Sequence, residues 1–289
     1  MYKLSDYNEI KYILKKHGFE TSKALGQNFI IDSEICPRMV EEAGVCESDC
    51  VLEIGAGIGV LTAELCKRAK KAAAIEIDKR LPDILADTLA EFNNFTLIEG
   101  DAMKLDLNQL IENTFGKGEK IKICANLPYY ITSPLIMKLL EERLPVESIT
   151  VMVQKEAGER LCAEVGSKNA GAVTAAVNYY AEARELFSVG RECFYPSPKV
   201  ESEVIKLTLR DKAPVDVPDE KQFFRVVRAA FSQRRKSASN SLSAALGIPK
   251  ADIIKMLEGL GFEPSIRAEK FSMEDFAAIT REVIKWNNF

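Results

Sequence analysis

Short apolar runs alternate with longer stretches of mixed character through the first half of the chain. Five of these runs lie between positions 51 and 153, at intervals of about 20 to 28 residues: VLEIG, AAAIEI, FTLIEG, IKICANL and SITVMV. Each has the length of a buried strand, and the stretch between two of them has the length of a helix. Strands that alternate with helices predict a parallel sheet with helical crossovers. Residues 1–20 read as a helix, with apolar positions at Tyr7, Ile10 and Leu14.

The pattern changes after residue 180. Two runs, ARELFSVG at 183–190 and SEVIKLTL at 202–209, have no helix-length stretch between them and predict an antiparallel pair that closes the sheet edge. DKAPVDVPD, residues 211–219, reads as a linker. Residues 220–289 show only helical periods, which are broken at GIPK and GFEPS. We therefore predict an α/β domain over 1–210, with an N-terminal helical extension, and a small all-helical domain over 220–289.

Composition narrows the class of protein. The chain has 289 residues with 47% hydrophobic side chains, enough for a core without disulfides. The seven cysteines are scattered, and Cys36, Cys46 and Cys50 lack the His or Cys pair that would complete a zinc site. We expect reduced thiols and no metal, and we expect the single His17 on the first helix. The sequence shows no signal peptide and no run of 18 apolar residues, which predicts a cytoplasmic protein without a membrane span.

Charge is distributed unevenly. The net charge is −4, yet residues 221–250 contain no acid. The basic residues of this segment are Lys221, Arg225, Arg228, Arg234, Arg235, Lys236 and Lys250. A basic block on an acidic body is typical of a local contact with nucleic acid. The alternative interpretation is a solvated helix face.

Two strand ends suggest a nucleoside cofactor. VLEIGAGIGVLT ends a predicted strand with Gly55, Gly57 and Gly59, whose spacing differs from the G-x-G-x-x-G of dinucleotide sites. Glycines allow a tight turn close to a ligand, although turns without ligands use them too. Glu76 ends the next strand, 21 residues after Gly55. An acid at this position can bind both ribose hydroxyls; the alternative is a helix N-terminal acid, with Asp78 as the cap.

The next two strand ends suggest a nucleobase amine as substrate. Asp101, in EGDAM, can accept a hydrogen bond from an adenine amino group of the cofactor. NLPYY follows the fourth strand. An exocyclic amine is a poor nucleophile because its lone pair is delocalised into the ring. The Asn126 oxygen and a backbone carbonyl at Leu127 or Pro128 could accept its two N–H groups and favour a tetrahedral nitrogen. Pro128 would hold the backbone rigid, and Tyr129 would stack on the base.

Taken together, the motifs resemble one family. ALGQNFI, VLEIGAGIGVLT, IEID, GDAM, NLPYYITSP, CFYPSPKVES and FSQRRKSASNSL follow one another as in the KsgA/RsmA family, over about residues 20–275. Its members are S-adenosylmethionine-dependent adenine N6-dimethyltransferases of small-subunit rRNA. The resemblance implies a class I methyltransferase (Rossmann-like) fold with a helical C-terminal domain. It also implies dimethylation of two adjacent adenines in the 3′-terminal hairpin loop of 16S rRNA, within the 30S subunit or its precursor. We expect a monomer.

The resemblance also implies roles for individual residues. Asn28 and the Ile30 backbone would contact the methionine part of S-adenosylmethionine, and Asn126 would lie beside the sulfonium. Phe194, the first residue of F-x-P-x-P-x-V-x-S, would be the second stacking face for the flipped adenine; the alternative is a core aromatic. The remaining assignments are Gly55 and Gly57 in the glycine loop, Glu76 on the ribose and Asp101 on the adenine. The basic block, rather than the resemblance, assigns Arg225, Arg228, Arg234, Arg235 and Lys236 to the RNA. SAS at 237–239 replaces a basic residue of many relatives, which predicts a weaker RNA contact there.

Three other functions share parts of this pattern. The 23S rRNA adenine methyltransferase of macrolide resistance has most of the motifs, but GQNF and NLPY favour the small-subunit enzyme over its SQNF and NIPY. A non-catalytic ribosome-assembly or transcription factor of the same fold would be expected to lose the glycine loop or Asn126. DNA adenine methyltransferases usually carry Asp/Asn-Pro-Pro-Tyr and a separate target-recognition domain.

Overall fold

The computed structural model describes residues 2–22, 24–233 and 235–287. The chain forms two compact units: Met1–Gly158 with Ala183–Leu209, and Glu159–Glu182 with Arg210–Phe289. The segment 159–182 therefore groups with the C-terminal helices, whereas the sequence analysis expected one continuous range over 1–210. Within the described part of the chain, no helix is long and apolar enough to span a bilayer.

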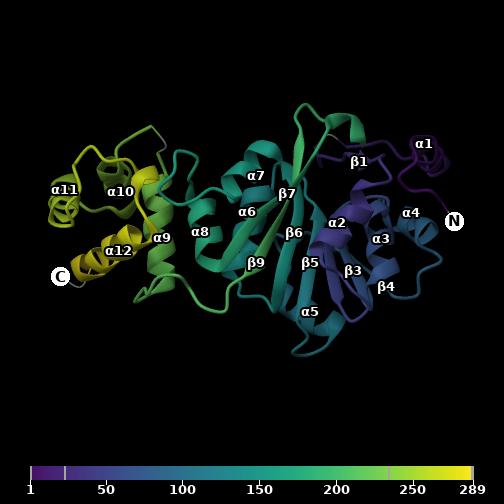
Figure 1. Cartoon of the computed structure of the whole chain (residues 1–289), viewed down its shortest axis with the longest axis horizontal. Coiled ribbons are helices and arrows are strands. Elements are labelled where there is room, and N and C mark those ends of the chain that lie inside the picture. Colours follow the sequence, from purple (N-terminus) through teal and green to yellow (C-terminus); the bar gives the residue numbers. More distant parts are fainter. Residues whose placement is uncertain (1, 23, 234, 288–289) are drawn as a thin grey trace. The chain divides into compact units, whose positions relative to one another are not determined.

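The first unit is built on a seven-stranded sheet with the order β4-β3-β2-β5-β6-β9-β7 (Figure 1). The strands are β2 (Cys50–Ile54), β3 (Lys71–Glu76), β4 (Phe95–Glu99), β5 (Ile121–Asn126), β6 (Val146–Gln154), β7 (Ala181–Val189) and β9 (Ser202–Leu209). The first five are parallel, and β9 is antiparallel to β6. The predicted α/β sheet is confirmed. Its strand order reverses between β2 and β5, and ligands of open parallel sheets bind outside the carboxyl ends at such a point.

The predicted edge pair is also confirmed. The outermost strand β7 is a neighbour of β9 in the sheet. The Arg210 N–H, just after β9, donates to the Tyr180 carbonyl, just before β7, at 2.8 Å. The end of one strand thus meets the beginning of the other, as in an antiparallel pair.

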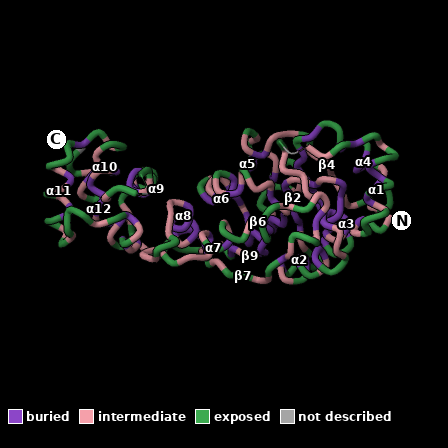
Figure 2. The backbone as a smooth tube through the Cα atoms, turned by 90° about the horizontal axis from the view of Figure 1, so that it is seen from above, coloured by how far each residue is buried: buried purple, intermediate pink, exposed green. Residues whose placement is uncertain are grey.

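Helices of the first unit connect the strands. They are α1 (Tyr7–Lys16), α2 (Ile35–Ala43), α3 (Val60–Arg68), α4 (Pro82–Thr88), α5 (Leu107–Phe115) and α6 (Thr132–Glu141), and α7 (Lys155–Leu161) extends across the boundary of the units. The central strands β2 and β5 are buried along nearly their whole length, as parallel strands covered on both faces must be. Figure 2 shows buried residues also around β6 and β9 of the same sheet.

The first helix is shorter than the sequence suggested. It begins after Asp6, whose side chain accepts from the N–H groups of Asn8 and Glu9, and it ends at His17. Ile10, Ile13 and Leu14 are buried, whereas Tyr7 is 39% exposed, so Tyr7 does not belong to the apolar stripe. His17 Nε2 lies 2.9 Å from Asp87, away from the predicted strand ends.

A second, two-stranded sheet was not anticipated. β1 (Phe29–Ile30) pairs antiparallel with β8 (Phe194–Tyr195), with Phe29 opposite Tyr195 and Ile30 opposite Phe194. A 3₁₀ turn at Arg191–Cys193 leads into β8. The GQNFI and CFYPSPKV motifs, far apart in the sequence, are therefore neighbours in the fold.

The second unit is mainly helical, and the helical C-terminal part of the fold, predicted over 220–289, is confirmed for its described residues. It contains α8 (Ala172–Tyr180), α9 (Glu220–Phe231), α10 (Ala238–Leu246), α11 (Lys250–Gly259) and α12 (Met273–Asn287). Its core includes stacked rings of Tyr180 and Phe224, with centroids 5.2 Å apart, and an edge-on pair of Phe271 and Phe276. Asp219 caps α9 by accepting from the N–H groups of Lys221 and Gln222.

Candidate active site

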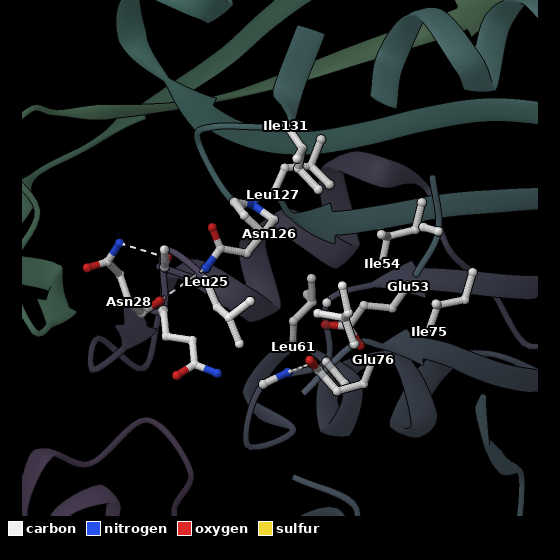
Figure 3. A pocket seen from close by; sticks show the side chains of 18 of the residues that line it. Leu25, Asn28, Glu53, Ile54, Leu61, Ile75, Glu76, Asn126, Leu127 and Ile131 are labelled. Carbon is white, nitrogen blue, oxygen red and sulfur yellow. Dashed lines mark hydrogen bonds between the residues drawn. The ribbon is translucent and has the colours of Figure 1, made fainter. Parts of the chain in front are cut away.

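A cavity of ≈ 200 Å³ opens at the carboxyl ends of β2, β3 and β5 (Figure 3). Its lining contains ten of the residues that the sequence analysis selected: Asn28, Ile30, Gly55, Gly57, Glu76, Asp101, Asn126, Leu127, Pro128 and Tyr129. The cavity lies where the strand order reverses. The fold thus brings the four predicted strand ends together because parallel strands end at one edge of a sheet.

The conformation of the glycine loop strongly favours glycine at two positions. Gly57 and Gly59 have φ values of +58° and +92°, which side chains rarely tolerate. A Cβ atom at Gly57 would lie 3.2 Å from the Phe29 ring, and one at Gly59 would lie 3.1 Å from Leu89. Gly59 is also the N-cap of α3. The loop is therefore tightly packed below the cavity, and its backbone can come close to a bound molecule.

Glu76 connects the end of β3 to this loop. Its two carboxylate oxygens accept from the N–H groups of Gly57 and Asp78, each at 2.9 Å, and the side chain is buried. Burial raises the pKa of Glu76, and the backbone N–H groups oppose this rise. Each carboxylate oxygen can accept a further hydrogen bond, so both can serve ribose hydroxyls.

The alternative interpretation of Asp78 as a helix cap is not borne out. The N-cap of α4 is Leu81. The Asp78 carboxylate instead lies 2.6 Å from Arg80 Nη2 and accepts from Gln27 Nε2 at 2.8 Å. The hydrogen bond from Arg80 is the main reason that the pKa of Asp78 falls to about 2. Asp78 therefore anchors the GQN segment beside the cavity.

Asp101 is held by its own turn. One carboxylate oxygen accepts from the Met103 N–H at 2.9 Å, and the other lies 3.7 Å from Lys104 Nζ. The side chain is part-buried at the cavity wall. Its oxygens remain within reach of a donor in the cavity, such as an amino group.

Asn126 is the last residue of β5, and a hydrogen bond fixes the orientation of its side-chain amide. Its Nδ2 donates to the backbone carbonyl of Asn28 at 3.4 Å, and the Asn28 side chain donates to the Gly26 carbonyl at 3.1 Å. Figure 3 shows the Asn126 oxygen on the side away from this contact. The amide therefore presents an acceptor, because its donor is directed to the GQN segment.

The two proposed backbone acceptors differ in the hydrogen bonds that the Pro128 carbonyl is seen to accept. The Pro128 carbonyl already accepts from the Ile131 N–H at 3.2 Å and from the Thr132 hydroxyl at 3.4 Å. Two donors occupy both lone pairs of a carbonyl oxygen. Of the two carbonyls that the sequence left open, the Leu127 carbonyl is thus the better candidate acceptor.

Tyr129 is fixed by a residue that the sequence analysis did not select. The Tyr129 hydroxyl lies 2.8 Å from Ser202 Oγ, at the first position of β9. Burial raises the pKa of Tyr129, so the phenol stays neutral at ordinary pH. Ser202 is the last residue of F-x-P-x-P-x-V-x-S, so the motif itself contained the signal.

Phe194 does not present a face to the cavity. Its ring is 2% exposed, it belongs to the hydrophobic core, and it is absent from the lining residues. The pairing of β8 with β1 draws it inward beside Ile30. The expected stacking face is thereby corrected in favour of the core-aromatic alternative. Tyr130, which is 56% exposed, is the more open aromatic side chain of the lining.

Glu53 is a second lining residue that sequence reasoning did not select. It is 1% exposed on β2 and accepts from the Thr62 hydroxyl at 2.5 Å. Burial raises its pKa to about 8, the charge of Glu76 adds to the rise, and the Thr62 bond opposes it. The sequence could have indicated Glu53, because it is an acid inside an apolar strand, two residues before Gly55.

Comparison with known proteins decides the family. The family model described as "Ribosomal RNA adenine dimethylase" matches residues 18–285. The chain belongs to this family.

Individual relatives agree with the family match. The "Ribosomal RNA small subunit methyltransferase A" of Bacillus mycoides is 45% identical over 280 residues, which cover 96% of each chain. The protein of the same name from Shouchella clausii is 47% identical over 270 residues, covering 93% of this chain and 91% of the relative.

Solved structures agree as well. A dimethyladenosine transferase from Plasmodium falciparum has a TM-score of 0.71 at 29% identity, with 89% of this chain and 98% of that chain covered. The 23S rRNA methyltransferase ErmE, at 23% identity and a TM-score of 0.64, shares the fold, with 89% and 99% covered.

The basic residues selected in this family member lie in the second unit. Arg225 and Arg228 are exposed on α9, which buries Phe223, Phe224, Val226 and Val227 on its other side. Arg235 and Lys236 are exposed between α9 and α10. Arg234 lies outside the described residues. This exposure agrees both with an RNA contact and with a solvated helix face.

The seven cysteines are all free thiols. Among the described residues, no three His, Cys, Asp or Glu side chains are grouped so as to hold a metal ion.

Proposed function

We propose that this protein transfers methyl groups from S-adenosylmethionine to the N6 atoms of two adjacent adenines in the 3′-terminal hairpin loop of 16S rRNA. The observation that carries this proposal is the Asn126 amide, oriented by Asn28 and next to the Leu127 carbonyl at the cavity. The names of the relatives, which specify small-subunit rRNA, support the substrate class. We further propose that it works as a monomer in the cytoplasm, on the 30S subunit or its precursor.

The lining residues fit S-adenosylmethionine. Glu76 would accept from the ribose hydroxyls, Asp101 from the adenine amino group, and the backbone of Gly55 and Gly57 would pack against the nucleoside. Asn28 and the Ile30 backbone would contact the methionine part. When bound, the cofactor supplies an electrophilic methyl group on a positively charged sulfur.

The chain's own groups activate the target amine. Asn126 Oδ1 and the Leu127 carbonyl would accept its two N–H groups, which localises the lone pair on nitrogen. Positive charge develops on that nitrogen as the new bond forms, and fixed acceptors stabilise it without reorganisation. Pro128 adds no competing N–H. The excess proton leaves after methyl transfer.

Aromatic side chains would hold the flipped base. Removing an adenine from its stack costs a few kcal/mol, which stacking on a side chain partly offsets. Tyr129 supplies one face, held by Ser202. We assign the second face to the exposed Tyr130 rather than to Phe194, because the Phe194 ring lies in the core.

The alternatives receive less support. The relatives named for the small subunit are 45% and 47% identical, against 23% for the 23S rRNA methyltransferase ErmE. A non-catalytic assembly factor would need neither an Asn126 amide oriented toward a substrate amine nor an intact glycine loop.

The experiment is methyl transfer from tritium-labelled S-adenosylmethionine to 30S subunits that lack this modification. Incorporation into 16S rRNA, with primer-extension stops at two adjacent adenines of the 3′ hairpin, is expected. The 50S subunit is the matched substrate control. Labelling of 23S rRNA instead would support the macrolide-resistance alternative, and no transfer to either subunit would support the non-catalytic factor.

A further inference from the structure

An exposed aromatic and basic surface lies outside the cavity, on α1. The exposed residues of this helix are Tyr7, Asn8, Lys11, Tyr12, Lys15 and Lys16, and none of them is acidic. Tyr7 and Tyr12 are 39% and 57% exposed, which places them among the most exposed large apolar side chains described.

Two of these side chains, Tyr7 and Lys11, form a defined cluster with Tyr195 of β8. The rings of Tyr7 and Tyr195 meet edge to face, with centroids 5.3 Å apart and planes at 84°. Lys11 Nζ lies 4.6 Å from the Tyr7 centroid and 5.9 Å from the Tyr195 centroid. We call this cluster, Tyr7, Lys11 and Tyr195, the α1 platform.

The charge of Lys11 remains available. Within residues 2–22, 24–233 and 235–287, Lys11 lies over two aromatic rings and forms no ion pair with a carboxylate. Lys16 differs, since its Nζ lies 2.7 Å from Asp87 and 2.8 Å from the Tyr2 hydroxyl. The Asp6 carboxylate at the start of α1 is bound to backbone N–H groups. A phosphate is a suitable partner for Lys11.

The α1 platform is one strand away from the cavity. Tyr195 pairs with Phe29 across the β1–β8 sheet, and Phe29 and Ile30 line the cavity. Paired residues of antiparallel strands are about 5 Å apart at their Cα atoms. A nucleotide next to the one in the cavity can therefore reach this surface.

We propose that the α1 platform holds unpaired rRNA beside the target adenine: a neighbouring base stacks on Tyr7, and Lys11 contacts the adjoining phosphate. This rests on the proposed function, which requires a flipped base and therefore a locally unstacked strand. Sites for single-stranded nucleic acid combine aromatic faces with cations in this manner. The absence of acids from the exposed face of α1 favours a polyanion.

The test uses the full-length variants Lys11→Gln, Tyr7→Ala and Tyr7→Phe. Binding to undermethylated 30S subunits, and to a transcript of the 16S rRNA 3′ hairpin, is measured over a range of KCl concentrations. Lys117→Gln is the matched control, because Lys117 is exposed before β5, at the opposite end of that strand from Asn126.

Lys11→Gln should reduce the log–log salt slope by about 0.7–0.9, the value for one phosphate contact. Tyr7→Ala should weaken binding roughly fivefold to a hundredfold, and Tyr7→Phe should bind like wild type because it keeps the ring. The control should leave both quantities unchanged. Affinity for S-adenosylmethionine should stay constant throughout, since neither side chain lines the cavity.

Two results would overturn the proposal. One is a plot of log affinity against log KCl concentration that has the same slope for Lys11→Gln and wild type, together with an unchanged RNA affinity of Tyr7→Ala. The other is weaker binding to 30S subunits with unchanged binding to the transcript, which would assign the surface to a ribosomal protein. Failure of the wild-type protein to methylate 30S subunits would instead contradict the proposed function, so the two failures are distinguishable.

Discussion

Asn126 shows how a single side chain can be prepared for chemistry before substrate arrives. Its Nδ2 is directed to the Asn28 carbonyl, so its oxygen is the group available to an incoming amine. Asn126→Ala should keep the affinity for S-adenosylmethionine within a few fold and lower the methyl-transfer rate on the order of 10²-fold, as for removal of one fixed polar group. Single-turnover transfer to 30S subunits measures this; a rate near that of wild type removes Asn126 from the acceptor role.

Glu76 has a structural role in the glycine loop and a proposed role in cofactor binding. It accepts from Gly57 in the glycine loop, and we propose that it also accepts from the ribose of the cofactor. Glu76→Ala should weaken S-adenosylmethionine binding by about 1.5–3 kcal/mol, the range for hydrogen bonds to a charged group. Titration calorimetry measures this, and urea unfolding without cofactor separates the effect of removing the Gly57 hydrogen bond. Unchanged affinity would exclude Glu76 from the cofactor site.

At the scale of helices and strands, polar contacts link neighbouring elements beside the cavity. The first of these contacts, between Glu53 and Thr62, links β2 to α3. Glu53 accepts from Thr62, and burial raises its pKa from 4.5 to about 8. The folded state therefore keeps a proton that the unfolded chain releases. The stability from Glu53 is fully present below about pH 4.5 and is lost as pH rises toward 8, with a slope of up to about 1.4 kcal/mol per pH unit.

Glu53→Gln should remove this part of the pH dependence, since an amide does not titrate and its oxygen can still accept from Thr62. Urea unfolding of both proteins between about pH 5 and pH 8 measures the difference. The variant should gain stability relative to wild type as pH rises. Equal slopes would mean that Glu53 is ionised in the folded protein.

The second contact joins the loop after β5 to the start of β9. Tyr129→Phe and Ser202→Ala each remove one hydroxyl of the pair at 2.8 Å. A double-mutant cycle on the free energy of unfolding should give a coupling of about 0.5–1.5 kcal/mol, the net value of a hydrogen bond. Ser202→Ala should also slow methyl transfer more than it weakens cofactor binding. A coupling near zero would show that Ser202 does not position Tyr129.

At the scale of the whole molecule, we expect the basic residues of the second unit to contact the RNA rather than the cofactor. Changing Arg235 and Lys236 to Ala should weaken 30S binding and reduce the log–log salt slope by about 0.7–0.9 for each phosphate that the variant no longer neutralises. Binding of S-adenosylmethionine should not change, because neither residue lines the cavity. Lys250→Ala, in the same basic segment, is the matched control. Equal log–log salt slopes for the variant and wild type would favour the interpretation that these residues form a solvated helix face.

Much of this molecule could be predicted from its sequence. The apolar runs located the strands to within a few residues, and Glu76, Asp101 and Asn126 were selected because polar groups suited to a nucleoside or an amine lie at the ends of these runs. That selection needs no tertiary information, since the carboxyl ends of parallel strands meet at one edge. The helical second unit followed from its periodicity in the same way. Patterns of burial within a few residues are local properties, and the sequence determines them directly.

What only the tertiary structure decided depends on segments far apart in the chain. The β1–β8 pair brings Ile30 opposite Phe194 and moves that ring from the expected binding surface into the core. Ser202 becomes the partner of Tyr129, and turn contacts occupy the Pro128 carbonyl, which favours Leu127 as the proposed backbone acceptor. The raised pKa of Glu53 follows from its burial, which the local sequence pattern does not reveal. These outcomes depend on which distant surfaces pack together, because packing and desolvation are summed over the whole fold rather than over neighbours in sequence.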